Sequence, residues 1–198
     1  MTTLEGWRAY NALCRGGVVT RDPRIHRFQS RYKMALQLET VIFTGMNEAT
    51  AAAYTAALRV GLAYSAFETL TAAVPDLEGG LVIKNKELAD SIRSRRNMRL
   101  HSLLLDNSDD RDNRLVKQIA QFLGNSSADC RPVAERIRHL TFHARLTATN
   151  SGMRASRSNV LCIQELANAT LSAASKAFGA WVLQTSESQS QNSGRKTD

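Results

Sequence analysis

The stretch from residue 129 to residue 146 holds the side chains best suited to chemistry. It reads DCRPVAERIRHLTFHARL and includes Arg138, His139 and His143. The two histidines are four residues apart, so a helix would place them on one face. Arg138 precedes His143 by five residues, which is about 140° around a helix. An arginine side chain is long enough that the two could still converge on one ligand at a helix end or across a groove.

Three interpretations of this cluster stay open on the residues alone. It could be a solvated basic face whose histidines only contact their neighbours. It could be a metal site, but no Asp, Glu or Cys is evidently placed to complete the ligand set. It could also be an anion site, because arginine binds phosphate through a planar fork and histidine moves a proton near neutral pH. Such a pair is sufficient in principle to cleave RNA without a metal or any other cofactor.

The elements that would carry this cluster are helical almost throughout. Apolar residues recur at helical spacing, most clearly in the last segment. The predicted helices cover residues 28–44, 47–74, 84–100, 114–123, 129–146 and 159–183. Residues 81–83 could pair briefly as a strand or begin a helix, and residues 106–113 and 147–158 are predicted loops. The fold class predicted is all-α, an up-and-down bundle of four long helices plus short ones.

Length and composition fit one domain. The chain has 198 residues, of which 43% are hydrophobic, and this is enough to build a core. We expect a single helical domain over residues 1–185 and a disordered polar tail over residues 186–198, which has no apolar side chain. The net charge is +8, which favours an anionic partner such as nucleic acid.

Several protein classes are disfavoured by what the sequence lacks. It has neither a GxxxxGK[ST] nor a GxGxxG loop, and neither a GxSxG nor an HExxH motif. No apolar stretch approaches the roughly 20 residues of a membrane helix, so no membrane association is expected. The three cysteines are widely spaced and odd in number, which suits a reducing, cytoplasmic location.

The run from Ile137 to Thr147 resembles the signature of the HEPN superfamily. That signature is an arginine, a polar residue, a few further positions and a histidine, on a late helix. Arg138, His139 and His143 match it with four residues between Arg138 and His143, and a long final amphipathic helix follows, as in the family. The resemblance is sharpest over residues 135–152 and agrees in helix order over about 28–183.

The resemblance implies a metal-independent endoribonuclease that acts in a toxin or defence system. Arg138 would orient the scissile phosphate, His143 would transfer the proton, and His139 would support Arg138. Glu68 resembles an acidic residue on an earlier helix that braces such sites, although it could equally be an exposed helix carboxylate. Family members commonly form homodimers with both copies lining one cleft, and cleavage leaves 2′,3′-cyclic phosphate and 5′-hydroxyl ends.

Positive charge is concentrated around the motif. Residues 84–157 contain 15 Lys and Arg against 8 Asp and Glu. If these side chains surround the cleft, they would steer RNA and make its binding salt-dependent, although a solvated face is the alternative. The predicted RNA-binding residues are Arg93, Arg95, Arg96, Arg99 and Arg145. The lone aromatic of the motif, Phe142, is expected in the core.

Two other functions remain open. The chain could be a catalytically inactive HEPN module that binds RNA or a nucleotide within a larger defence or toxin–antitoxin complex. It could also be a DNA-binding regulator, but no helix–turn–helix with a spaced glycine turn is evident. In HEPN toxins that a partner nucleotidyltransferase modifies, a tyrosine closely follows the histidine. Here positions 144–146 are Ala, Arg and Leu, which disfavours that particular antitoxin.

Overall fold

The protein is an all-α structure, as the sequence predicts. The computed structural model describes residues 4–42, 44–77, 82–94, 97–105, 113–142 and 157–194. The helices are α1 (Trp7–Arg15), α2 (Pro23–Gln37), α3 (Glu48–Ala73), the short 3-10 helix η1 (Pro75–Leu77), α4 (Lys86–Arg93), α5 (Met98–Leu105), α6 (Asn113–Leu123), α7 (Arg131–Phe142) and α8 (Arg157–Gly194). The predicted loop over residues 106–113 lies outside the described residues except for Asn113, which begins α6.

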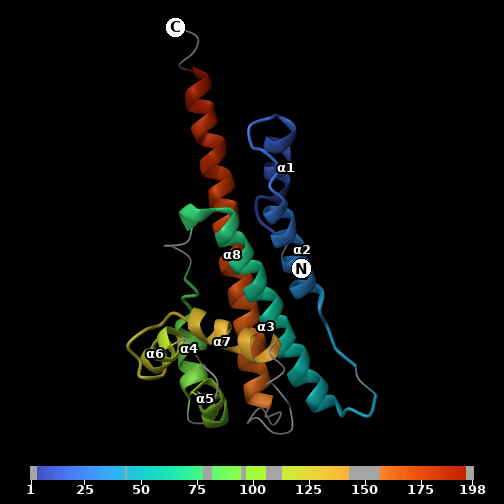
Figure 1. Ribbon diagram of the computed structural model, residues 1–198, viewed down its shortest axis with the longest axis vertical. Helices are drawn as coiled ribbons and strands as arrows, with labels where there is room; N and C mark the ends of the chain where they lie inside the picture. The colour runs from blue at the N-terminus through green and yellow to red at the C-terminus, as the bar shows by residue number, and fades with distance from the viewer. Residues whose placement is uncertain are drawn as a thin grey trace.

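Helix α3 is the centre of the bundle. Asn47 caps its start, because its side chain accepts a hydrogen bond from the backbone N–H of Thr50 at 2.9 Å. It packs against α2, α7 and α8, and Figure 1 shows it running between α2 and α8. Side chains on several sides of α3 are therefore buried, including Val60, Tyr64 and Phe67. A helix with apolar side chains on all sides is stable only when other helices surround it, and this explains the central position of α3.

Helix α2 begins and ends earlier than predicted. Asp22 caps its start by accepting from the N–H of Arg24 at 2.7 Å, and Pro23 occupies the first helical position. The helix ends at Gln37, because Leu38 is extended and the chain turns toward α3. There the N–H of Val41 donates to the hydroxyl of Thr55 at 2.9 Å. The apolar residues after Gln37 therefore do not continue the helix, and Ile42 among them is 83% exposed.

Helix α1 was absent from the sequence-based prediction. It packs its aromatic face against the second half of α8, where the ring centroids of Tyr10 and Phe178 are 5.7 Å apart. Trp7 lies 6.2 Å from Phe178 and 5.5 Å from Tyr10, centroid to centroid. A nine-residue helix has little stability of its own, so this tertiary packing determines that it forms.

The predicted helix over residues 84–100 is interrupted. Helix α4 ends at Arg93, Ser94 is extended, and α5 starts at Met98. Asn97 is buried between the two helices and donates from its side-chain amide to the carbonyl of Ser91 at 2.7 Å. Its amide oxygen accepts from the hydroxyl of Ser158, at the start of α8, at 3.0 Å. A polar side chain thus joins α4, α5 and α8 at the point where a continuous helix was expected.

Helix α7, which carries the motif, follows a tight connection from α6. Asn125, just beyond α6, has a φ of 62°, and the first turn of α7 is held by Asp129. That carboxylate accepts from the N–H of Arg131 at 2.9 Å and from the N–H of Ile83 at 3.0 Å. Lys84 and Asp129 form an isolated antiparallel bridge, so the segment after residue 81 pairs briefly and does not begin a helix there. Residues of the predicted helix beyond Phe142 lie outside the described residues.

Helix α8 is longer than predicted. It extends from Arg157 to Gly194, so the expected disordered tail is helical over residues 186–194, and only residues 195–198 lie outside the described residues. Its last part extends past the other helices (Figure 1). The predicted loop over residues 147–158 lies outside the described residues up to 156. No described helix is long and apolar enough to cross a membrane.

Candidate active site

Arg138 and Glu68 meet where α7 crosses α3. The guanidinium Nη2 of Arg138 is 3.3 Å from Oε2 of Glu68, and the two side chains are 33% and 42% exposed. Arg138 lies on the last turns of α7, and Glu68 lies on α3 five residues before that helix ends. The pair is thus formed by two packed helices and not by a loop, and half-burial gives the ion pair more weight than a fully exposed one.

Part of the Arg138 guanidinium is left without a partner. Its Nε is buried and has no hydrogen-bond acceptor among the described residues. A buried N–H without an acceptor costs free energy, on the order of 1–3 kcal/mol. The arginine therefore keeps one unsatisfied donor, which an anion could reach if the side chains covering Nε moved aside while Glu68 holds another part of the same group.

Phe142 covers one side of this arginine. The prediction that it lies in the core is wrong. Its side chain is 50% exposed, and the Cζ of Arg138 lies 6.0 Å from the centre of its ring. The ring rests on Gly61 of α3, where a Cβ would come within 2.9 Å of Cε2 of Phe142. Gly61 thus lets the aromatic ring lie close to the α3 backbone beside the Arg138–Glu68 pair.

A second carboxylate, Glu135, lies one turn earlier on α7. Its Oε2 accepts from the hydroxyl of Tyr64 at 3.0 Å, and its Oε1 is 3.3 Å from Nη2 of Arg114 on α6. Burial raises the pKa of Tyr64, and the negative charge of Glu135 raises it further, so the phenol stays protonated and acts as a donor. This network fixes α7 against α3 and α6 just before Arg138.

Burial and charge act in opposite directions on Glu68. Burial raises the pKa of its carboxyl above the ordinary value, Arg138 opposes that shift, and Glu135 adds to it. Arg31 of α2 also lowers the pKa of Glu68, and it donates to the carbonyl of Ser65 at 3.3 Å. Two cations from different helices, Arg31 of α2 and Arg138 of α7, thus act on the carboxylate of Glu68.

The predicted partners of Arg138 are described only in part. His139 is half-buried on α7, directly after Arg138. His143 and Arg145 lie outside the described residues, as do Arg95 and Arg96. The backbone of Arg99 belongs to α5, but its side chain is outside the described set. The structure therefore brings Arg138 and Glu68 together, while the geometry of the predicted proton-transfer group His143 stays a prediction.

Arg93 is engaged in the fold. Its Nε donates to the carbonyl of Phe122 at 2.7 Å, its Nη2 donates to the carbonyl of Ser127, and its Cζ lies 4.6 Å from the centre of the Phe122 ring. The side chain is only 12% exposed and also pairs with Asp90. These contacts tie α4 to the end of α6, and a side chain engaged in this way is not available to bind RNA as predicted.

Sequence reasoning missed three residues that lie around the Arg138–Glu68 pair, namely Tyr64, Glu135 and Arg31. Tyr64 and Glu68 are four apart on α3, and Glu135 and Arg138 are three apart on α7, so each pair shares a helix face. That spacing was a usable signal for a two-helix charge network. Arg31 had no such signal, because only the packing of α2 on α3 brings it near Glu68.

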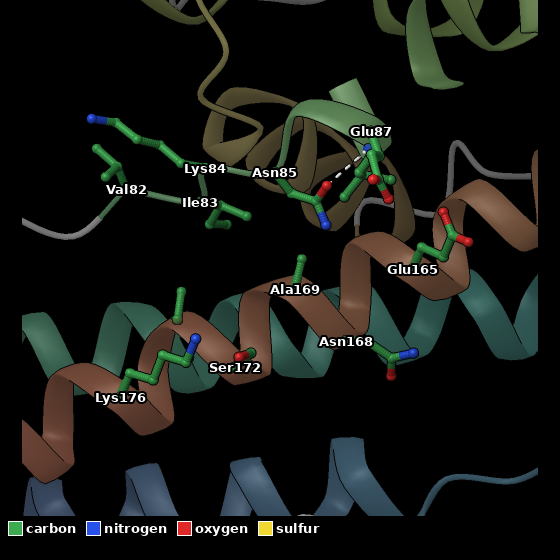
Figure 2. A pocket seen from close by; sticks show the side chains of 12 residues that line it. Val82, Ile83, Lys84, Asn85, Glu87, Glu165, Asn168, Ala169, Ser172 and Lys176 are labelled. Atoms are coloured by element: carbon green, nitrogen blue, oxygen red, sulfur yellow. Dashed lines mark hydrogen bonds between the residues drawn. The ribbon is translucent and has the colours of Figure 1, made fainter. Parts of the chain in front are cut away.

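A separate hollow of about 580 Å³ lies between α8 and the segment 82–88. Figure 2 shows Lys84 and Lys176 toward one end and Glu87 and Glu165 toward the other. Asn85 at its wall accepts from the N–H of Leu88 at 3.0 Å and caps α4. Because its opposite charges are spread along the hollow, it lacks the group of convergent cations that a phosphate ester would require.

Among the described residues, no group of three or more His, Cys, Asp or Glu is placed to hold a metal ion. Comparison of the chain with protein-family models, with curated proteins and with solved structures gave no match. The resemblance to HEPN proteins therefore stays a prediction, and the chemistry of the site is interpreted from its own residues.

Proposed function

We propose that the protein is a metal-independent endoribonuclease of the HEPN type, acting in the cytoplasm as a toxin or defence effector. One observation carries the proposal. Arg138 of the motif is held by Glu68 on a neighbouring helix, yet its buried Nε has no acceptor among the described residues. A phosphate oxygen would supply that acceptor once the side chains covering Nε move aside, and arginine is the side chain best shaped to bind one.

The proposed reaction is an internal transesterification. The ribose 2′-oxygen attacks the adjacent phosphorus while the bond from phosphorus to the 5′-oxygen breaks. One proton leaves the 2′-hydroxyl and one is delivered to the departing 5′-oxygen. The products are a 2′,3′-cyclic phosphate and a 5′-hydroxyl, with no oxidant or metal required. Proton transfer is assigned to His143, and stabilisation of the charge on phosphorus is assigned to Arg138.

Glu68 acts in this proposal as a positioning residue. It fixes the direction of the Arg138 side chain from the α3 side, and its negative charge restrains the arginine in the absence of RNA. His139 is proposed to support Arg138 from the adjacent position. Arg95, Arg96, Arg99 and Arg145 are proposed to contact RNA, and a homodimer is proposed to combine the motifs of two copies in one cleft.

A catalytically inactive module that binds RNA or a nucleotide is the second candidate, with a toxin–antitoxin or defence complex as its setting. The ion pair itself favours it, because a carboxylate paired with Arg138 reduces the positive charge available to stabilise the charge on phosphorus, which cleavage requires more than binding does. This candidate shares the ligand of the first and differs only in turnover, so one assay separates them.

The test is incubation of the purified protein with total RNA in EDTA, followed by analysis of the new ends. The parent protein should cleave and leave 2′,3′-cyclic phosphates. Arg138→Ala and His143→Ala should each reduce cleavage by at least about 100-fold, which is the usual contribution of an acid–base or charge-stabilising group. Lys117→Gln, which removes one exposed cation from α6, should leave the rate within about twofold.

Each result points to one candidate. Intact RNA with the parent protein, together with retained RNA binding, would favour the inactive module. Cleavage by Arg138→Ala at the parent rate would show that the site is wrongly assigned. Loss of activity in EDTA would return the histidine pair to the metal interpretation.

A further inference from the structure

Helix α1 carries a row of arginines that the proposed active site does not use. Arg8, Asn11 and Arg15 follow one another at intervals of three and four residues, so they line one face of the helix. Arg8 and Arg15 are about 10 Å apart along the axis, from the helical rise per residue. Together with Arg21, these side chains surround a hollow of about 380 Å³.

The turn after α1 brings the third arginine into place. Gly17 has a φ of +72°, which reverses the chain after the helix, and the N–H of Val18 donates to the carbonyl of Leu13 at 3.0 Å. The segment that follows this turn then places Arg21 at the same hollow as Arg15. Two separate segments thus converge to present three guanidinium groups.

These arginines have no carboxylate partner among the described residues. The adjacent carboxylate, Asp22, is committed to Arg24, whose Nη2 lies 2.7 Å from Oδ2 and whose Nε lies 3.0 Å from the same oxygen. Hydrogen bonding to Arg24 lowers the pKa of Asp22, so its charge stays engaged there. Arg8, Arg15 and Arg21 are all exposed.

An apolar hollow of about 730 Å³ adjoins the arginine hollow, and Arg8 lines both. It lies between α1 and α2 and is lined by Trp7, Tyr32 and Leu36 together with polar side chains. With its amide oxygen turned toward them, Gln29 accepts from Nε1 of Trp7 at 3.2 Å and from Nζ of Lys33 at 3.0 Å. The indole is therefore held in orientation while it still forms part of the hollow's wall.

One carboxylate, Glu5, also lines the apolar hollow, and its negative charge adds to the raised pKa of Tyr32 in the same wall. Its Oε2 is 3.4 Å from the position that a Cβ on Gly179 of α8 would take, so the carboxylate lies against α8. The backbone N–H of Glu5 donates to the hydroxyl of Ser175 at 3.0 Å, which anchors the start of α1. Glu5 is outnumbered by the cations that line the two hollows, Arg8, Arg15, Arg21 and Lys33, so the net charge along them is positive.

We propose that this surface, the α1 groove, binds single-stranded RNA, with a base in the apolar hollow and neighbouring phosphates on Arg8, Arg15 and Arg21. A nucleic-acid strand alternates flat apolar bases with anionic phosphates, which matches an aromatic hollow next to guanidinium groups. Duplex RNA fits less well, because its bases are stacked and paired. The proposal deepens the ribonuclease function and rests on RNA being its ligand.

The α1 groove is distinct from the Arg138–Glu68 pair. It is formed by α1, α2 and the turn between them, whereas the pair is formed by α3 and α7. In Figure 1, α1 lies nearer than α7 to the end of the molecule at which α8 terminates. A strand that contacts both would be held at two places, and the α1 groove would raise affinity without touching the reacting phosphate.

The test measures binding of a fluorescent 2′-O-methyl RNA of about 12 nucleotides, a length within the range of known single-strand sites. This strand lacks the 2′-hydroxyl and cannot be cleaved. The variant Arg15→Gln/Arg21→Gln should weaken binding about tenfold. It should also reduce the slope of log affinity against log salt by about 1.4, because each phosphate contact contributes about 0.7 for a single strand. The control Lys86→Gln/Lys117→Gln removes the same charge from α4 and α6 and should bind within about twofold of the parent.

A second readout tests the base position. In a Trp181→Phe background the only remaining tryptophan is Trp7, and its fluorescence should fall when RNA binds. An abasic strand of the same length should bind more weakly and leave the fluorescence unchanged. Equal binding of the abasic strand, or of heparin, with no change at Trp7 would overturn the proposal in favour of non-specific charge attraction. Thermal unfolding of each variant checks that the exposed substitutions leave the fold intact.

The outcomes separate this inference from the proposed function. Normal RNA binding by the Arg15→Gln/Arg21→Gln variant would refute the α1 groove and leave the ribonuclease proposal standing. Groove-dependent binding by a parent protein that never cleaves RNA would refute the ribonuclease proposal alone. A parent protein that binds no single-stranded RNA would refute both.

Discussion

At Glu68, burial and the neighbouring Arg138 act on the same carboxyl in opposite directions, and burial prevails. The folded protein therefore holds this proton more tightly than the unfolded chain does. The resulting stabilisation is fully present below the unfolded pKa of about 4.5 and is lost as the pH rises through the folded pKa. At neutral pH the ion pair thus requires the charged form of Glu68, which burial disfavours.

Glu68→Gln should remove this pH dependence. Relative to the variant, the parent protein should lose stability between about pH 4 and pH 7, by less than about 1 kcal/mol because both partners are half-exposed. Urea unfolding at both ends of that range measures the difference. Glu165→Gln, an exposed glutamate of α8, is the matched control. A parent that gains stability over Glu68→Gln as the pH rises would show that the Arg138 pairing outweighs burial.

Gly61 and Phe142 should be energetically coupled. Replacing a mid-helix glycine by alanine normally stabilises a helix by about 0.5–1 kcal/mol. Here the new Cβ meets the Phe142 ring at 2.9 Å and must displace it. In a Phe142→Ala background, Gly61→Ala should give that full gain, whereas in the parent it should give little or none. Equal effects in both backgrounds, measured by chemical unfolding, would mean that the half-exposed ring moves aside at no cost.

At the scale of elements, one buried amide joins three helices. Asn97 links the end of α4 to the start of α8 through Ser91 and Ser158. Asn97→Ala should lower the free energy of unfolding by about 1–3 kcal/mol, because a buried carbonyl loses its donor. Asn168→Ala, at an exposed position of α8, should change it by less than about 0.5 kcal/mol. Similar losses in the two variants would show that Asn97 is dispensable for this junction.

The helices that sequence reasoning found were those with their own local signals. Helix α3 has the Asn47 cap and a long apolar pattern, and α6 ends at Gly124 as predicted. Helix α1 was missed because its formation depends on packing of Tyr10 and Trp7 on Phe178, which is 168 residues beyond Tyr10. The end of α8 has only polar side chains, so its sequence predicts disorder although the residues are helical.

Only the part of the candidate site that has a local sequence signal could be predicted. Arg138 stood out through the motif, and Glu68 through the resemblance. The spacing of Tyr64 and Glu68, and of Glu135 and Arg138, indicates a shared face on each helix. Which partners meet, Arg114 included, depends on how α3, α6 and α7 cross, and no local pattern encodes that. The α1 groove could not be predicted at all, because the turn at Gly17 creates it from two segments.

At the scale of the whole molecule, the proposed homodimer sets an expectation for kinetics. If two copies form one cleft, activity per molecule should rise with protein concentration near the dissociation constant of the dimer and then level off. Cleavage rates across a dilution series, paired with measured mass against the 21.8 kDa of one chain, test this. Constant specific activity from a species of monomer mass would show that one copy suffices.

The Arg138–Glu68 contact also bears on which anions can enter the site. Glu68 is a tethered competitor for the Nη2 of Arg138, so a ligand gains that part of the guanidinium only in the fraction of molecules in which the pair is open. Small anions that make a single contact would be screened out, while an RNA strand held elsewhere on the surface would prevail through high local concentration. Because the pKa of Glu68 is raised, mild acid should protonate this competitor, and anions that make few contacts should then bind Arg138 more readily.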